Sequence, residues 1–320
     1  MSVSLMLEKV KQRSGIAQKA DLAAVSKILC SVTTPYPNGD DCAVIERNGV
    51  FNLLAIEGFM NKFVARDPWF AGWCGIMVNL SDIAAMGGVA DAIWCKNEDG
   101  MSSIMKGMLA ASEAYGVPIV GGHTHLKGNQ QQLAVSILGH ANRVLSSFAA
   151  TPGQNIVVAI DLRGEYRAPF LNWNAATSSP VDRLRGDLAL LPHIAEQSLA
   201  TAAKDISQAG LLGTIIMLLE SSNVGANIQL EAIPKPQEVG WDDWLCTFPS
   251  FGFILTCDDE SLSDLLSCFE SRCIAAAKVG KINNSRQFWV RDGTSAHLFW
   301  DFDESALTGL GRAPIHHTKE

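Results

Sequence analysis

Five carboxylates in this sequence stand at the expected ends of strands and helices, where a solvated surface position is not the simplest explanation. Asp40 and Asp41 come directly before an apolar strand in "PNGDDCAVIE", and Glu57 ends the apolar strand of "LLAIEGF". Asp82 lies inside the apolar run "WFAGWCGIMVNLSDIAAMGG", and Asp205 precedes the glycine-containing turn of "DISQAGLLG". Carboxylates that converge repel each other unless a cation holds them, and oxygen-only ligands favour a hard ion. The pattern therefore predicts a Mg²⁺ site.

Each of these positions also has a purely structural explanation. Gly-Asp-Asp is a common turn, Asp205 could cap the helix that follows it, and Glu57 could be an exposed strand end. Asp82 is harder to explain in this way, because an unpaired carboxylate in an apolar helix is costly to bury. The combination of all five favours a metal site over a set of separate caps.

Glycine-rich turns accompany the carboxylates, in "GDD", "GG" at 87–88, "GGHT" at 121–124 and "QAGLLG". Glycine lets a backbone approach phosphate oxygens closely, and the N–H groups of such turns and of helix N-termini attract anions. The sequence contains no GxxxxGK[ST] loop and no protein-kinase signature. We therefore expect a magnesium–nucleotide site of another kind.

The elements that must position these residues alternate irregularly between helix and strand. The first half predicts amphipathic helices over 5–30, a strand pair around the turn at Asn48-Gly49, the apolar helix that ends at 87–88, a strand "VADAIWC", a helix over 102–115, and the strands "VPIVGG" and "LAVSILGHA". A turn at Thr151-Pro152-Gly153 marks the most plausible domain boundary. The second half predicts strands "NIVVAID", "NIQLEAIP" and "FGFILTC", helices over 186–203, 207–222 and 260–274, and the segment "AAAKVGKI".

Bulk composition narrows the classes of function. The 320 residues suffice for two domains, and 48% hydrophobic with 18% charged residues is an ordinary globular composition. A net charge of −8 argues against a general nucleic-acid binder and against a polybasic membrane surface. No apolar run approaches the ~20 residues of a membrane span, and the start lacks a signal-peptide layout. The eight cysteines include no CxxC pair, so we expect a cytoplasmic protein with reduced thiols.

Five motifs follow one another along the chain: "GDDCAVI", "IEGFMNKFVARDPWFAG", "VNLSDIAAMGG", "PIVGGHTHLK" and "DISQAGLLGTIIMLLE". This series resembles the PurM-like superfamily, which includes aminoimidazole ribonucleotide synthetase, thiamine-monophosphate kinase, selenophosphate synthetase and the HypE hydrogenase-maturation protein. The match extends from about residue 38 to residue 225. The chain resembles the superfamily more closely than any named member, and it is most similar to a divergent AIR-synthase-related branch.

The resemblance implies an α+β fold of two domains. Residues 1–150 would form an N-terminal ATP-binding and dimerisation domain, and residues 151–320 a C-terminal α/β-sandwich domain. In the superfamily, strands of the first domain pair with those of a second subunit to form a shared barrel, so a homodimer is implied. ATP and Mg²⁺ are the implied cofactors. The γ-phosphoryl group would pass to a small-molecule substrate, while the protein positions the reactants and neutralises charge.

The resemblance also implies the site residues. The metal ligands would be Asp40, Asp41, Glu57, Asp82 and Asp205. The contacts to ATP and its phosphates would be Asp40, Asp41, Asn79, Asp82, Gly121, Gly122, His123 and Thr124. Basic residues that could meet an anionic substrate are Lys127, Arg163 and Arg167, with Arg183 and Arg185 as further candidates, although all of these could equally belong to solvated loops.

Some residues depart from the patterns of the named members. Glu57 stands where aspartate is usual, and its longer side chain shifts the carboxylate outward, although Mg²⁺ is strict about geometry. Gln208 replaces a second aspartate of the thiamine-phosphate kinases, and His123 is more similar to selenophosphate synthetase. A small-molecule kinase and an activating synthetase or cyclase therefore both remain open. A catalytically weak nucleotide-binding partner protein is the alternative; Glu57 and Gln208 favour it, and the retained aspartates oppose it.

Overall fold

The computed structural model describes residues 2–29, 34–98, 101–125 and 132–311, and the backbone forms two compact units. Unit 1 comprises Met1–Asp40, Leu145–Trp173 and Leu199–Glu320, and unit 2 comprises Asp41–Val144 and Asn174–Ser198. The predicted domains, 1–150 and 151–320, remain a prediction. The compact units are arranged differently along the chain, because the first 40 residues group with the second half of the sequence.

Unit 2 is built on a five-stranded sheet with the order β1-β2-β5-β3-β4. The strands are β1 (Ala43–Arg47), β2 (Val50–Gly58), β3 (Val89–Glu98), β4 (Ile119–His125) and β5 (Leu133–Ala141). All neighbours are antiparallel except β3 and β4, which are parallel. The sheet is open in the described residues, with β1 and β4 at its edges, so the shared barrel remains a prediction.

The first hairpin of unit 2 forms as the sequence predicts. Asn48 and Gly49 have φ values of 55° and 80°, the left-handed conformation that a two-residue hairpin turn requires at both central positions. Along β5, buried residues alternate with more accessible ones, from Leu133 to Ala141. Such alternation places one face of the sheet against a core and leaves the other face accessible.

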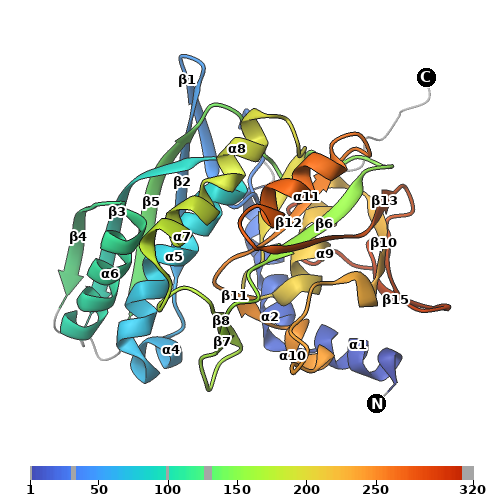
Figure 1. Cartoon of the computed structure of the whole chain (residues 1–320), viewed down its shortest axis with the longest axis horizontal. Coiled ribbons are helices and arrows are strands. Elements are labelled where there is room, and N and C mark those ends of the chain that lie inside the picture. The colour runs from blue at the N-terminus through green and yellow to red at the C-terminus, as the bar shows by residue number, and fades with distance from the viewer. Residues whose placement is uncertain (1, 30–33, 99–100, 126–131, 312–320) are drawn as a thin grey trace. The chain divides into compact units, whose positions relative to one another are not determined.

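Helices cover the buried face of this sheet, as Figure 1 shows for α5 and α6. The helices of unit 2 are α4 (Asn61–Arg66), α5 (Pro68–Ala85), α6 (Met101–Tyr115), α7 (Val181–Leu188) and α8 (Leu190–Glu196). Helix α5 begins where Asp67 accepts a hydrogen bond from the N–H of Phe70 with Pro68 in the first turn, and it ends before Gly87, whose φ is 74°. Sixteen consecutive residues of α5, 70–85, are buried.

Unit 1 is built on a seven-stranded sheet with the order β15-β14-β10-β13-β6-β12-β9. The strands are β6 (Asn155–Ile160), β9 (Ala202–Asp205), β10 (Gly225–Gln229), β12 (Gly252–Cys257), β13 (Ala275–Asn283), β14 (Gln287–Asp292) and β15 (Ser295–Asp301). A small sheet with the order β11-β8-β7 is formed by β7 (Glu165–Tyr166), β8 (Asn172–Asn174) and β11 (Phe248–Pro249). Strands β6 and β12 are buried along their whole length, which places them at the centre of the core.

The helices of unit 1 are α1 (Val3–Lys11), α2 (Ser14–Ala17), α3 (Leu22–Leu29), α9 (Gly210–Ser222), α10 (Trp241–Trp244) and α11 (Leu262–Glu270), with 3₁₀ turns at Gln18–Asp21 and Leu230–Ala232. Helix α9 is buried on all sides from Gly210 to Ser221. It shares one hydrophobic core with β6, β10 and the first turns of the chain, including Met6, Leu7 and Val10. This explains why the N-terminal helices belong to unit 1.

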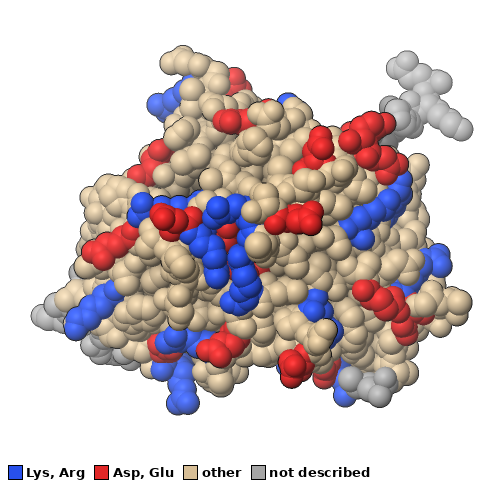
Figure 2. All heavy atoms as spheres, in the orientation of Figure 1, with Lys and Arg blue, Asp and Glu red and all other residues tan. Residues whose placement is uncertain are grey.

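The structure confirms the mixed α+β class and corrects one predicted element. The expected helix over 186–203 is wrong at its end, since α8 stops at Glu196 and residues 202–205 form the edge strand β9. Pairing with β12 overrides the helical preference of the alanine-rich segment. No helix within the described ranges is long and apolar enough to cross a membrane. On the face shown in Figure 2, acidic and basic side chains are interspersed.

Candidate functional site

The central feature of unit 2 is a close pair of aspartates. A carboxylate oxygen of Asp41 lies within 4.8 Å of a carboxylate oxygen of Asp82. Asp82 projects from the last turns of α5 and is only 4% exposed, whereas Asp41 is half-buried just before β1. A divalent cation in contact with both carboxylates would stabilise a pair at this separation, one member of which is buried. Because the donors are carboxylate oxygens, the pair fits Mg²⁺ better than a soft metal.

Asn79 lies one turn before Asp82 on the same side of α5 and is fully buried. Its Nδ2 donates a hydrogen bond of 2.8 Å to the carbonyl oxygen of Gly75, which fixes the orientation of the amide. Its Oδ1 has no hydrogen-bond partner among the residues that the structure describes. A buried oxygen of this kind costs free energy unless a ligand or water satisfies it, so Asn79 is suited to a polar ligand near Asp82.

Glu57 lies at the end of β2, on the face of the sheet that α5 covers. It follows Leu53 and Ala55 in the strand alternation, and both of these are buried under the helix. Glu57 pairs with Val135, and a Cβ added at Gly75 of α5 would lie 2.9 Å from the Val135 side chain. Glu57 therefore lies beside the stretch of α5 that leads to Asn79 and Asp82.

Residues 121–124 occupy the edge strand β4, at the same end of the sheet as Glu57. The strand registers place Glu57, Val135, Cys95 and Gly122 in one row across β2, β5, β3 and β4. Three strand spacings separate the ends of this row, roughly 14 Å. One metal ion cannot touch both ends, but an extended ligand can. Gly122 and His123 are exposed, Gly121 is half-buried, and for Thr124 the structure describes only the backbone.

Asp40 has a different environment from Asp41, although the two are adjacent in sequence. One of its carboxylate oxygens accepts hydrogen bonds from the Oγ of Ser146 (2.6 Å) and the N–H of Ser147 (3.2 Å). The other accepts from the Oγ of Ser147 (2.7 Å) and from the same N–H (3.1 Å). These contacts within unit 1 anchor the turn that precedes Asp41.

Asp205 belongs to unit 1, where it is the last residue of β9 and is 4% exposed. It pairs with Phe253 of β12, and the next amide, Ile206 N–H, bonds to the carbonyl oxygen of Gly252. The edge strand thus holds Asp205 rigidly before the turn that opens α9. Gln208, in the same turn, is exposed.

The predicted substrate-binding residues have less support. Lys127 lies outside the described residues. The guanidinium of Arg163 bonds to Asp161 (2.7 Å) and to the carbonyl oxygen of Arg272 (3.1 Å), which ties it to its own unit. Arg167 is half-buried, and its N–H pairs with the carbonyl oxygen of Asn172 across β7 and β8. Arg185 binds the carbonyl oxygens of Glu113 (2.7 Å) and Ala114 (2.9 Å) at the end of α6, so it has a structural role.

Two further sets of polar residues in unit 1 were not predicted. Ser146 and Ser147 bind Asp40, but nothing in "VLSSFAA" distinguishes them from an ordinary turn. Glu220 is a buried carboxylate in the apolar helix "TIIMLLESS", the same signal that identified Asp82. That signal could have revealed its buried hydrogen bonds.

Comparison with known proteins assigns the chain to a family. The model of the AIR synthase related protein N-terminal domain matches residues 39–141, and that of the C-terminal domain matches residues 171–292. Together they cover more than half of the chain. The chain belongs to the AIR synthase related family, within the PurM-like superfamily.

Relatives of this AIR synthase related chain include an uncharacterized protein, a kinase and a dikinase. An uncharacterized protein of Synechocystis sp., sll0787, is 38% identical over 97% of this chain and 99% of its own length. Thiamine-monophosphate kinase of Pyrococcus abyssi is 30% identical over 63% of this chain and 68% of its own length. Selenide, water dikinase of Myxococcus xanthus is 25% identical over 73% of this chain and 72% of its own length.

Solved structures show the same fold. T. maritima PurL complexed with ATP superposes with a TM-score of 0.74 and 17% sequence identity, over 97% of this chain and 54% of that chain. The chain therefore spans about half the length of the PurL protein. The likeness supports the two-domain α+β PurM-like fold.

Proposed function

We propose that this AIR synthase related protein is an ATP- and Mg²⁺-dependent enzyme that transfers a phosphoryl group to, or activates, a small molecule. The observation that carries the proposal is the Asp41–Asp82 pair, whose oxygens lie within 4.8 Å of each other beside the buried amide of Asn79. The names of the relatives, a thiamine-monophosphate kinase and a selenide, water dikinase, support the same class of reaction.

In this proposal, Asp41 and Asp82 hold Mg²⁺ with Asp205 as a third ligand, and Glu57 contributes directly or through water. Mg²⁺ would neutralise phosphate charge during the transfer. The chain's own work is to keep these carboxylates fixed and ionised, and to offer N–H donors of residues 121–124 to an extended nucleotide. Rigid elements suit this task, because Asp82 lies on a buried helix and Asp205 on a fully buried strand.

The test is calorimetric titration of Mg²⁺–ATP into the wild-type protein and into Asp82→Asn, with a chelator control. We expect saturable binding that the chelator abolishes, and a loss of affinity in Asp82→Asn of roughly 100-fold or more, because even outer-shell partners of a metal contribute 10- to 100-fold. The matched control is Asp264→Asn, an exposed aspartate on α11, which should bind like the wild type.

The outcome also separates the two functional classes. Binding followed by turnover of ATP with a candidate acceptor supports the enzyme, either as a kinase of the thiamine-monophosphate type or as an activating synthetase. Binding without turnover across an acceptor screen favours a nucleotide-binding partner protein, for which Glu57 and Gln208 are the motivating residues. Chelator-insensitive binding, or none, would contradict the proposal.

A second copy of the chain is the proposed partner. The face of the unit 2 sheet opposite α5 carries exposed apolar side chains on neighbouring strands: Ile45 (47%), Leu54 (45%), Ile56 (68%) and Leu138 (44%). Leu54 and Leu138 are directly paired in the register, so the apolar surface is continuous across β2 and β5. Contiguous exposed apolar surface of this kind marks interaction sites. We propose that it forms the homodimer interface.

A further inference from the structure

Helix α9 ends in a buried carboxylate that binds the last described segment of the chain. Glu220 is 8% exposed. One of its oxygens accepts hydrogen bonds from the N–H groups of Leu307 (2.8 Å) and Gly309 (3.2 Å). The other accepts from the N–H (2.9 Å) and the hydroxyl (2.5 Å) of Thr308. Consecutive N–H groups that converge in this way form an anion-binding concavity, and here the chain fills it with its own carboxylate.

The segment 307–311, which binds Glu220, also packs closely against the turn that precedes Asp41. A Cβ added at Gly39 would lie 2.7 Å from the Cβ of Leu310, and Gly39 has a φ of 117°. The hydroxyl of Ser26 donates to the carbonyl oxygen of Gly309, which adds α3 to the same contact. Leu310 therefore closes over the glycine that begins the Gly-Asp-Asp turn.

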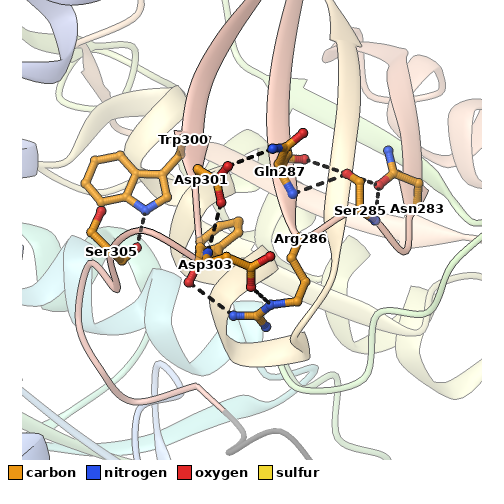
Figure 3. A network of polar contacts seen from close by, with 9 residues as sticks. Asn283, Ser285, Arg286, Gln287, Trp300, Asp301, Asp303 and Ser305 are labelled. Atoms are coloured by element: carbon orange, nitrogen blue, oxygen red, sulfur yellow. Dashed lines mark hydrogen bonds and ion pairs between the residues drawn. The ribbon is translucent and has the colours of Figure 1, made fainter.

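Polar contacts also hold the residues that precede the segment 307–311, as Figure 3 shows for Asp301, Asp303 and Ser305. Arg286 pairs with Asp303 at 2.7 Å, and the Nε2 of Gln287 donates to Asp301 at 2.7 Å. The indole N–H of Trp300 donates to the carbonyl oxygen of Ser305 at 2.9 Å. Residues 301–305 are thereby held against the β14–β15 hairpin before the segment 307–311 begins.

The same end of α9 also contacts the turn at Gly39 and Asp40 from its other side, through Ser222 and Ser147. The Oγ of Ser222 donates to the carbonyl oxygen of Ser147 (2.6 Å) and accepts from the N–H of Ala150 (2.9 Å). Ser147 in turn donates to Asp40 through its N–H and its hydroxyl. Gly39 and Asp40 are thus held from two directions by contacts that begin at Glu220 and Ser222.

We infer that Glu220 and Ser222 are positioning residues for Asp41. They fix the two residues before it, and a rigid turn limits where the Asp41 carboxylate can lie. Such support matters for Mg²⁺, whose near-octahedral coordination tolerates little displacement of its ligands. The inference rests on the proposed function, because it assigns Asp41 to the metal.

The first experiment is hydrogen exchange of the full chain, measured by mass spectrometry without nucleotide. We expect Glu220→Gln to speed exchange in peptides covering 38–44 by about fivefold or more, because the amide N–H₂ of Gln faces N–H donors that it cannot accept from. Peptides from 70–85 in α5 should be unchanged. The matched control is Glu270→Gln, an exposed glutamate at the end of α11.

The second experiment measures the Mg²⁺ concentration needed for half-maximal ATP binding. We expect Glu220→Gln to raise this Mg²⁺ concentration about tenfold, in the range of an outer-shell contribution, while the number of nucleotides bound per total protein chain stays the same. A merely destabilised protein would lose stoichiometry instead. Thr308→Val removes the hydroxyl without changing size and should show a smaller rise, whereas Thr308→Ser keeps the hydroxyl and should match the wild type.

The outcomes separate the two ideas. Wild-type binding of Mg²⁺–ATP, with unchanged exchange and unchanged Mg²⁺ dependence in Glu220→Gln, overturns the positioning role alone. Absence of Mg²⁺–ATP binding by the wild type overturns the proposed function and the metal-directed role with it. If Glu220→Gln does not fold, Ser222→Ala and Thr308→Val carry the same test, because each removes one hydroxyl and leaves the carboxylate in place.

Discussion

Gly107 of α6 faces the backbone of α5 so closely that an added Cβ would lie 1.9 Å from the carbonyl oxygen of Trp69. The contact is reciprocal, because a Cβ at Gly72 of α5 would lie 2.1 Å from the carbonyl oxygen of Ile104. The two helices therefore approach through paired glycines, and this approach fixes the helix that carries Asn79 and Asp82.

The first prediction concerns this helix contact. Gly107→Ala should destabilise the protein by about 3 kcal/mol, at the upper end of overpacking costs, because the obstacle is backbone and cannot rotate away. Urea unfolding monitored by circular dichroism measures the change. Gly58→Ala is the control, since nothing lies within 4 Å of its added Cβ. Equal midpoints for Gly107→Ala and the wild type would show that the helices can separate without cost.

Glu57 should contribute less to the metal than Asp82 does. Its position beside α5 allows contact with the ion through water, so Glu57→Gln should weaken the apparent Mg²⁺ affinity by roughly tenfold, as for an outer-shell ligand. Glu57→Asp tests whether a shorter side chain at this position binds more tightly. Mg²⁺ titration at saturating ATP reports both. An unaltered Mg²⁺ dependence in Glu57→Gln would remove this residue from the site.

The proposed dimer should depend on the exposed apolar face. Leu54→Asp places a charge in the centre of that face, opposite Leu138, and should shift the protein toward monomer by at least about tenfold in dissociation constant, since burying an unpaired charge is costly. Sedimentation velocity over a concentration series measures the shift. Leu109→Asp, at an exposed apolar position on α6, is the control. A wild type that is monomeric at every concentration would rule out the interface.

Stability should fall in alkaline solution because of a buried thiol. Burial raises the pKa of the Cys257 thiol from 9.0 to about 11. The unfolded thiol ionises first, so the stabilisation is complete below pH 9 and is lost as the pH rises toward 11. At pH 10 the loss is about 1 kcal/mol. Cys257→Ala should flatten this part of the curve of unfolding free energy against pH. The control Cys273→Ala, at an exposed cysteine, should leave the curve unchanged. If unfolding free energy depends on pH in the same way in both variants, the loss of stability does not come from Cys257.

The sequence singled out the carboxylates of the candidate site, but not the residues that hold them in place. A carboxylate in an apolar helix made Asp82 a candidate ligand, which stays a prediction. The alternating strand pattern around Asn48-Gly49 predicted the first hairpin correctly. The hydrogen bonds of Asp40 could not be predicted, because its partners lie 106 and 107 residues away and are ordinary serines. The segment at 202–205 was assigned to a helix because alanine favours one, and only the neighbouring β12 makes it a strand.

The order in which the chain visits its two units has a consequence for how the protein can be divided. The chain passes from one unit to the other after Asp40, Val144, Trp173 and Ser198. A fragment ending at residue 150 would carry the N-terminal helices without the sheet they pack on, and it would lack α7 and α8. Neither unit can be cut out as one contiguous gene segment. Each unit is therefore complete only after segments from both halves of the chain have been synthesised.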